Sequence, residues 1–387
     1  MPSGIDFWKL RASVAAVGSG GTTAYLTAFN YNVATNFTSG LLNPTDIPNL
    51  DLKPEKTISY EVGTDFRMFA NRVEFDLALY STRTIDQIIQ VPIEPSSGFS
   101  TQWYNAGEMR NQGIEIQLSG SPIVNKDGFN WKIFGNMASN RSKIVSVPNE
   151  ERRLSLSTVY GSRGSIEARE GGRYGDMYGF GYRRNANGDI IYQNGLPLAS
   201  EELVYIGNVN PTLKAGLGSE FRYKNFAFNF LFDGQWGGIG YSLTHAVLMS
   251  EGKLKKSIPG RYGGIIGDGV VDNGDGTYSP NTVIAEAQPY YDAHFNRDNL
   301  ESNTFSTDFI KLRELRFDYN FPKEFVSRLG LQNAAVGVYG RDLFMITRWP
   351  AFDPEFGSLN SSGIEKGAEI AQFPSTRTFG LNLQFAF

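Results

Sequence analysis

The sequence predicts an all-β fold, the wall of an antiparallel transmembrane β-barrel with long extracellular loops and short periplasmic turns. The C-terminal residues STRTFGLNLQFAF alternate strictly between apolar and polar side chains and end on an aromatic residue. Successive strand residues point to opposite faces, so this segment fits an apolar medium on one side and water on the other. Similar segments recur along the chain, and the connections between them alternate between short and long.

About ten segments have this alternation and the length of a tilted bilayer-spanning strand. They lie at residues 8–14, 58–68, 73–80, 114–118, 129–137, 213–221, 226–232, 309–319, 336–343 and 379–387. The second and third are joined by a tight turn and form a predicted hairpin. The alternation changes phase between Leu312 and Leu315, which predicts a β-bulge.

The connections sort by length without exception. Short turns are predicted at residues 69–72, 120–127, 224–225 and 322–333, and long loops at 18–54, 85–106, 141–211, 239–304 and 347–374. Outer-membrane barrels have short periplasmic turns and long extracellular loops, whereas soluble sheets have no reason for this order. Counting back from a periplasmic C-terminus places every long loop outside.

Aromatic residues gather at the short-turn ends of the predicted strands, as in the interfacial girdle of a membrane barrel. They are Phe7, Trp8, Phe66, Phe69, Phe129, Trp131, Phe221, Tyr223, Phe226, Tyr319, Phe321, Phe385 and Phe387. The alternative is aromatic cross-strand packing in a surface-exposed β-sandwich with a binding or adhesion function. That alternative explains neither the loop order nor the terminal phenylalanine.

Composition excludes several classes of function. A net charge of -4 without a basic stripe argues against a nucleic-acid partner, and the absence of cysteine excludes disulfides and thiolate chemistry. The only histidines, His245 and His294, lie in one long loop with no metal or triad pattern. The acidic stretches at residues 267–281 and 185–189 lack the closing glutamate of a calcium loop and are expected to be turns. We therefore expect no enzyme activity and no cofactor or metal.

Several stretches resemble TonB-dependent outer-membrane transporters, and more narrowly the SusC/RagA family of Bacteroidetes nutrient importers. The resemblance is carried by LNPTDIPNLDLKPEKTISYEVGTDFRMFANRVEFDLALYSTRTIDQI, YNAGEMRNQGIEIQL, GGRYGDMYGFGYRRNANGDIIYQNGLP, IGNVNPTLKAGLGSEFRYKNFAFNFLFDGQWGG, FIKLRELRFDYNFP, GRDLF and DPE. Together these stretches cover most of the chain.

The resemblance implies a signal sequence, a TonB box, a plug domain and a barrel of about 22 strands. None of the first three is expected within residues 1–387, which correspond to the C-terminal part of such a barrel. We therefore expect an open, curved sheet whose first and last strands do not pair with each other. The family implies the outer membrane of a Gram-negative, Bacteroidetes-like cell, import of oligosaccharides or peptides, TonB as the energy source, and a SusD-like surface lipoprotein as partner.

Three sets of residues with an expected role follow. Loop aromatics that could stack on a solute at the outer mouth are Trp103, Tyr104, Tyr174, Tyr178, Trp236 and Trp349. The terminal strand is expected to be the signal for the barrel-assembly machinery through Phe379, Leu381, Leu383, Phe385 and Phe387. Charged residues of the first hairpin are expected to face inward and to form ion pairs that stabilise the wall, because in lipid they would be very costly: Glu61, Asp65, Arg67, Glu74 and Asp76.

Overall fold

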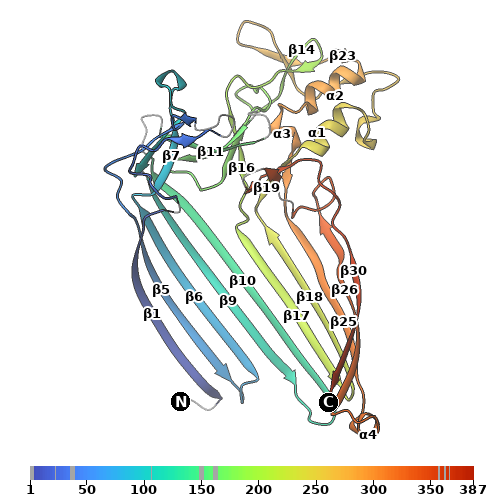
Figure 1. Ribbon diagram of the computed structural model, residues 1–387. Helices are drawn as coiled ribbons and strands as arrows, with labels where there is room; N and C mark the ends of the chain where they lie inside the picture. Colours follow the sequence, from blue (N-terminus) through green and yellow to red (C-terminus); the bar gives the residue numbers. More distant parts are fainter. Residues whose placement is uncertain are drawn as a thin grey trace.

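Ten long strands form one antiparallel sheet in the computed structural model, which describes residues 4–21, 23–34, 40–105, 107–147, 152–159, 164–355, 358–360, 363–365 and 367–387. The strands run side by side, tilted, with both chain ends at one end of the sheet (Figure 1). In sheet order they are β1 (Ile5–Ser19), β5 (Glu55–Met68), β6 (Val73–Ile85), β9 (Glu108–Ile123), β10 (Phe129–Ser146), β17 (Leu213–Tyr223), β18 (Phe226–Trp236), β25 (Phe309–Asn320), β26 (Asn333–Thr347) and β30 (Thr378–Ala386). Every predicted strand is confirmed.

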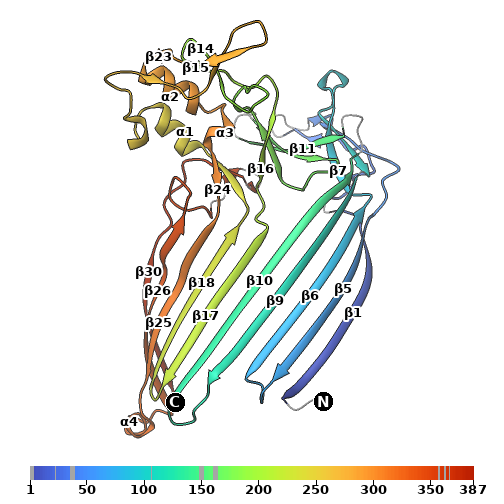
Figure 2. The same ribbon diagram turned by 180° about the vertical axis from the view of Figure 1, so that it is seen from behind.

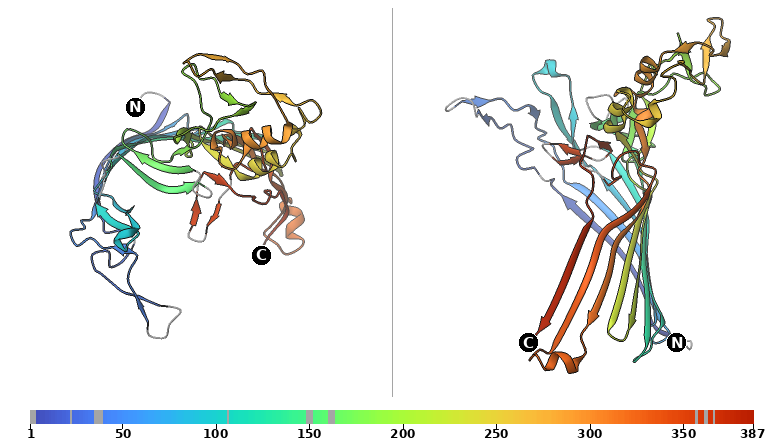
Figure 3. Two further views of the ribbon diagram at one scale, coloured as in Figure 1. Left: turned by 90° about the horizontal axis from the view of Figure 1, so that it is seen from above. Right: turned by 90° about the vertical axis from the view of Figure 1, so that its right-hand side faces the viewer.

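The sheet curves into an open arc when it is viewed from above (Figure 3). β1 and β30 are its two edges, and no ladder joins them within the described residues. The predicted open sheet is therefore confirmed. The β-sandwich alternative is wrong, because all ten long strands belong to a single sheet rather than to two packed ones.

The register gives the sheet one apolar and one polar face. Val62 pairs with Ala12 and Leu79, and Leu77 pairs with Ile116, so apolar residues continue one another across neighbouring strands. The opposite face carries polar positions in the same way, from Asp76 beside Gln117 to Gln117 beside Asn136. A hollow of about 590 Å³ lies on this polar face, which is therefore the concave face of the arc.

Short turns and outer loops alternate as predicted, and the largest differences in boundary are at two strands. β9 continues to Ile123 and β10 to Ser146, beyond the predicted starts of a turn at residue 120 and a loop at residue 141. The extension of β9 lies at the short-turn end and that of β10 at the outer end, where Lys143 pairs with Arg110 at the start of β9. Here both strand faces carry polar residues, so the alternation that marks a strand between lipid and water is lost. The last short turn holds a small helix, α4 (Lys323–Ser327).

The outer loops build an ordered assembly above the sheet (Figure 2). It contains the helices α1 (Leu243–Ser250), α2 (Ala287–Phe295) and α3 (Leu300–Asn303) and the turns η1 (Pro95–Ser97) and η2 (Lys255–Ser257). Its short strands form small sheets: β11 (Arg153–Val159), β12 (Gly164–Arg169), β13 (Asp176–Gly179) and β16 (Val204–Asn208); β15 (Leu196–Pro197), β14 (Ile191–Gln193), β21 (Val270–Asp272) and β22 (Tyr278–Pro280); β24 (Thr304–Ser306), β19 (Ile239–Ser242) and β29 (Ala368–Glu369); β4 (Asp46–Ile47), β8 (Thr101–Asn105) and β7 (Ile88–Pro92); β2 (Asn32–Val33) and β3 (Leu41–Leu42); β20 (Ile265–Ile266) and β23 (Ile284–Ala285); β27 (Ser358–Asn360) and β28 (Gly363–Glu365).

The main hydrophobic core lies in this outer assembly. It packs Met177, Tyr241 and Leu300, each with no exposed surface, against neighbours from four sequence segments. The long sheet instead exposes large apolar residues along its convex face, including Leu10, Val14 and Leu381 at over 60 % of their surface. A sheet that leaves one face apolar without covering it needs an apolar surrounding, such as lipid.

Aromatic residues line the end of the sheet that carries the termini. Trp8 stacks on Phe66 at 5.6 Å between ring centroids, Phe226 contacts Tyr319 at 4.9 Å, and Phe321 stacks on Phe325 of α4 at 5.5 Å. This is the girdle expected from the sequence. Amphipathic rings at this height suit the boundary between hydrocarbon and headgroups.

Candidate functional site

The concave face is a wall of polar and charged side chains. Its hollow is lined by residues from β6 through β25, together with Glu355 from the last outer loop. The polar members are Asp76, Glu115, Gln117, Asn136, Lys214, Asp233, Gln235 and Glu355, and Ala138, Leu231 and Phe309 add apolar surface between them. Carboxylates, amides and one lysine give such a surface hydrogen-bonding groups of both kinds. It can contact a hydrated solute or another polar protein surface, whereas an apolar ligand would leave these groups unpaired.

A network of ion pairs lies at the outer end of this wall. Lys311 is 3 % exposed, and its ammonium donates to both carboxylate oxygens of Asp353 at 2.7 and 2.8 Å and also to Glu355. Arg313 donates to Asp233 at 2.7 Å and to Asp342 at 3.0 Å. Its remaining nitrogen contacts both oxygens of Glu355 at 2.5 Å.

The predicted bulge explains why Arg313 and Asp342 meet. The register shifts between Leu312 and Glu314, so Arg313 has no ladder partner on either side and turns toward the concave face. On the facing strand Asp342 adopts a positive φ of 51°, a conformation that aspartate tolerates better than most residues. Neither Arg313 nor Asp342 takes part in the ladder between β25 and β26, and the two side chains meet at the bulge. A bulge that redirects a side chain in this way is a common device beside functional sites.

Three of the stretches that carried the family resemblance thus meet at one point. Lys311 and Arg313 come from FIKLREL, Asp342 from GRDLF, and Asp353 with Glu355 from DPE. Sequence reasoning identified the stretches but did not predict that they form one network. The stretches lie far apart in the chain, and nothing in any one of them indicates the other two.

The same outer loop is anchored a second time by Glu369. This carboxylate is 1 % exposed and accepts hydrogen bonds from the Ser242 and Thr244 hydroxyls, each at 2.6 Å, and from the backbone N–H of Gln372 at 3.1 Å. Ser242 caps α1, so the charge lies at the positive end of the helix dipole. The loop after β26 is therefore held to the wall through Asp353 and Glu355 and to the outer assembly through Glu369.

A second ion-pair network crosses the first strands. The Arg11 guanidinium lies over Gly63 and donates to both oxygens of Asp76 at 2.6 and 2.7 Å, with Glu61 at 3.5 Å. A Cβ at Gly63 would lie 2.5 Å from the arginine Nε, so only glycine leaves room for this crossing. The prediction that charges of the first hairpin form wall-stabilising ion pairs agrees with this geometry for Glu61 and Asp76.

Both histidines are buried in the outer assembly. The His294 ring joins Tyr182 and Tyr192 through its two nitrogens, at 2.9 and 3.0 Å, and burial lowers the pKa of His294 to about 4. His245 lies against Asn303 at 3.0 Å, and burial likewise lowers its pKa. Each ring thus serves as a neutral link between loop segments.

The predicted stacking aromatics do not form one cluster. Trp103 and Tyr104 lie on β8, Tyr174 precedes β13 at 50 % exposure, and Trp236 ends β18. Tyr178 is covered by the Arg169 guanidinium at 3.5 Å. Trp349 is 6 % exposed and packs against Phe305, which leaves little of its ring for a solute. Their role in solute binding remains a prediction.

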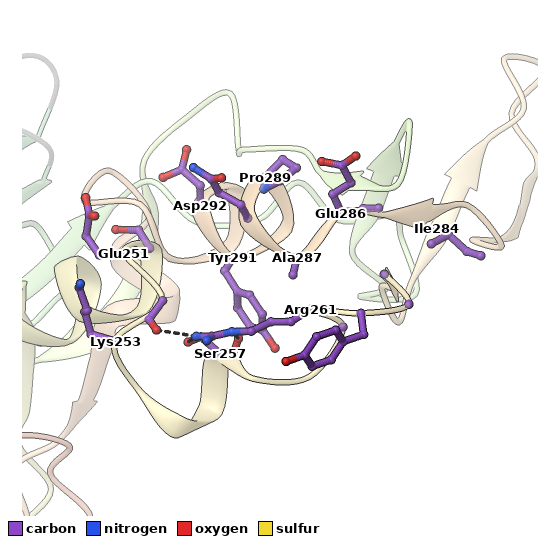
Figure 4. Close-up of a pocket in the computed structure, with 18 residues that line it drawn as sticks. Glu251, Lys253, Ser257, Arg261, Ile284, Glu286, Ala287, Pro289, Tyr291 and Asp292 are labelled. Carbon is purple, nitrogen blue, oxygen red and sulfur yellow. Dashed lines mark hydrogen bonds between the residues drawn. The ribbon is translucent and has the colours of Figure 1, made fainter.

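A separate cleft of about 1270 Å³ lies in the outer assembly, between the end of α1 and the start of α2 (Figure 4). Arg261 and Tyr291 project into it, and Glu251, Glu286 and Asp292 stand around it. Sequence reasoning did not select any of these residues, because they are brought together from separate turns of one long loop.

Groups of histidine and carboxylate residues that could hold a metal ion are absent from the described parts of the chain. The acidic turn at residues 272–277 is closed by its own hydrogen bonds, such as Asp275 accepting from the Thr277 hydroxyl at 2.6 Å. The described helices are all too short or too polar to cross a membrane.

Comparisons with known proteins agree with this architecture. Residues 5–244 match the family described as TonB dependent receptor-like, beta-barrel. A TonB-dependent receptor of Formosa agariphila is 26% identical over 98% of this chain and 40% of its own length. The TonB-dependent receptor SusC of Bacteroides thetaiotaomicron is 25% identical over 87% of this chain and 32% of its own length.

Among solved structures, that of the RagAB peptide transporter superposes with a TM-score of 0.75 over 100% of this chain and 42% of its own chain, at 19% identity. At this identity the match shows the fold alone. The chain thus spans about two fifths of the length of the relatives it matches. The family match, the relatives and the shared fold lead to one conclusion: the chain belongs to the TonB-dependent receptor-like β-barrel family, as part of an outer-membrane barrel of the SusC/RagA type.

Proposed function

We propose that this chain forms part of the wall and outer mouth of a transporter that imports oligosaccharides or peptides across the outer membrane. The observation that carries the proposal is the concave polar wall. At its outer end, Lys311 and Arg313 bind the last outer loop through Asp353 and Glu355. The similarity to SusC and the fold shared with the RagAB peptide transporter support the same class of function.

The two sheet edges support a role within a larger barrel. Unpaired strand edges expose rows of N–H and C=O groups, which are not tolerated in hydrocarbon. We infer that β1 and β30 each pair with a further strand of the complete barrel. Residues 1–387 would then supply its C-terminal part, with a plug and a TonB box provided by the rest of the transporter. Phe379, Leu381, Leu383 and Phe385 lie on the lipid face of β30, with Phe387 just beyond its end, where the barrel-assembly machinery could recognise them.

The partner is proposed to be a SusD-like surface lipoprotein. The ordered outer assembly supports this, since it holds many apolar side chains exposed to solvent, among them Tyr25, Leu50, Tyr262 and Phe373. Large exposed apolar groups on an ordered surface are typical of protein contacts.

Transport is tested in cells with and without the intact gene. Uptake of fluorescent oligosaccharides and peptides should depend on the gene for at least one solute and should stop when a protonophore removes the energy source. A surface lipoprotein should co-purify with the receptor. Unchanged uptake of every solute, with the receptor present in the outer membrane, would refute the proposed function.

A further inference from the structure

A row of cations crosses the convex face at the outer ends of β6, β9 and β10. Lys143 pairs with Arg110 in one ladder, and Arg110 pairs with Arg83 in the next, so the three residues stand side by side. Leu79 and Ile114 pair on the convex face nearer the short turns. Arg83 and Arg110 lie an even number of residues further out on the same strands, so they share that face. Lys143, Arg110 and Arg83 are called the basic row below.

One carboxylate lies within this row. Glu108 accepts from Arg83 at 2.5 Å and from Arg110 at 3.0 Å, and its side chain is 14% exposed. The two guanidinium groups keep 47% and 53% of their side-chain surface exposed. Glu108 therefore holds both arginines in place and leaves them accessible from the convex side.

The other cations of this surface have no carboxylate of their own. Lys143 and Arg141 of β10 and Lys56 of β5 are exposed and form no ion pair with any described residue. Arg141 pairs with Gln112 one step closer to the apolar band, and Lys56 pairs with Ile85 one step further out. Both therefore lie on the convex face beside the basic row.

The height of the basic row follows from strand geometry. Arg83 lies ten residues along β6 from Val73, the first residue after the short turn. At about 3.3 Å per residue and a tilt of about 40°, this distance spans a height of about 25 Å. The apolar band of an outer-membrane barrel is about 25 Å tall. The basic row therefore lies where the outer lipid headgroups begin.

Folding alone does not account for these charges. Like charges directly opposite each other on neighbouring strands are destabilising. Five cations surround one carboxylate here, although the chain as a whole carries a net charge of -4. Guanidinium and ammonium groups bind phosphate through short, charge-assisted hydrogen bonds. A phosphate at this height would compensate the charges that Glu108 leaves over.

We propose that this surface binds the phosphorylated headgroup of a lipid of the outer leaflet. Arg141 and Lys143 contact the phosphate directly, and the exposed guanidinium groups of Arg83 and Arg110 complete the site. The acyl chains of the same lipid lie along the apolar band below. The inference goes beyond the proposed function, because it assigns a lipid site on the outside of the barrel, whatever solute passes through it.

The intact receptor, purified from outer membranes and delipidated in detergent, is titrated with monophosphoryl lipid A and with the same lipid after removal of its phosphate. Native mass spectrometry counts the bound lipid. The phosphorylated lipid should bind, and removal of its phosphate should weaken binding roughly tenfold or more. Arg141→Gln combined with Lys143→Gln should weaken binding of the phosphorylated lipid by a similar factor.

The matched control is Lys126→Gln combined with Lys132→Gln. It removes the same charge from exposed positions at the short-turn end of β10 and should leave binding unchanged. All four residues are exposed, and the mobility shift of heat-modifiable barrels confirms that both double variants fold.

Three results would overturn the inference. Equal binding of the phosphate-free lipid would mean that the acyl chains alone are recognised. An equal loss of binding in the two double variants would mean that the lipid responds only to overall charge. Displacement of the lipid by an equal concentration of inorganic phosphate would mean that the surface binds free anions and not a headgroup.

Discussion

Lys311 shows how much one buried charge can depend on a distant loop. Its side chain is 4% exposed, and both of its partners, Asp353 and Glu355, come from the last outer loop. A buried ammonium is tolerated only when it is paired, so formation of the wall and placement of the loop depend on each other.

Lys311→Ala should release the outer loop from the wall. Removing one partner of a buried ion pair costs about 3 kcal/mol or more, which would raise the opening of residues 350–355 roughly a hundredfold. Amide hydrogen exchange of the purified receptor measures this directly. Lys214→Ala is the control, because Lys214 lines the same wall and forms no ion pair with any described residue. Equal exchange in the two variants would contradict the coupling.

His294 makes the outer assembly sensitive to acid. Its pKa is lowered by burial to about 4, from an ordinary value near 6.5, so the folded state favours the neutral ring. The unfolded segment binds a proton at higher pH than the folded one. Stability from this group is therefore complete above about pH 6.5 and is lost as the pH falls toward 4.

At pH 5 the helix α2 should exchange its amides faster than at pH 7, after correction for intrinsic rates. A loss of about 2 kcal/mol is expected at that pH. His294→Gln keeps hydrogen-bonding groups near Tyr182 and Tyr192 but cannot titrate, so it should remove most of the pH dependence. Unchanged pH dependence in this variant would assign the effect to other groups.

At the scale of the element, strand alternation decides which side chains meet lipid. Ile116 lies between Leu77 and Met137 on the convex face of β9, while its neighbour Gln117 faces Asp76 and Asn136 on the concave face. The two positions are at the same height in the same strand, so they differ only in the medium that they face.

Ile116→Arg should impair insertion into the membrane far more than Gln117→Arg. An arginine on the lipid face near the midplane costs about 2 to 4 kcal/mol, whereas a luminal arginine beside Asp76 costs little. Folding into lipid vesicles, followed by the mobility shift of heat-modifiable barrels, gives the relative stability. Equal effects would mean that the facing of the strands is wrong.

The alternation of apolar and polar residues also determines which parts of each strand can be predicted from the sequence. Strands between lipid and water, such as β5 and β30, carry a period-two signal along their whole length and were predicted closely. At the outer ends of β9 and β10, polar residues occur on both faces, as around Arg110 and Lys143, so these ends carry no such signal. The helices α1 to α3 were missed because the folded outer loops pack against one another and not against the sheet.

At the scale of the whole molecule, the sequence predicted an open sheet but not the contacts that join the outer loops to it. Loop order, the aromatic girdle and the apolar terminal strand follow from local patterns. The pairing of Arg313 with Asp342 and Glu355, and the contact of Glu369 with α1, join residues far apart in the chain. No local period specifies such contacts, so the candidate site emerges only from the fold.

The central claim is that these ten strands are one arc of a larger outer-membrane barrel. The structure of the intact gene product in lipid nanodiscs, determined by electron cryo-microscopy, tests it most directly. The expected result keeps the observed register from β1 to β30 and shows each of these two edge strands hydrogen-bonded to a further strand. A ladder between β1 and β30, closing a ten-stranded barrel, would contradict the claim.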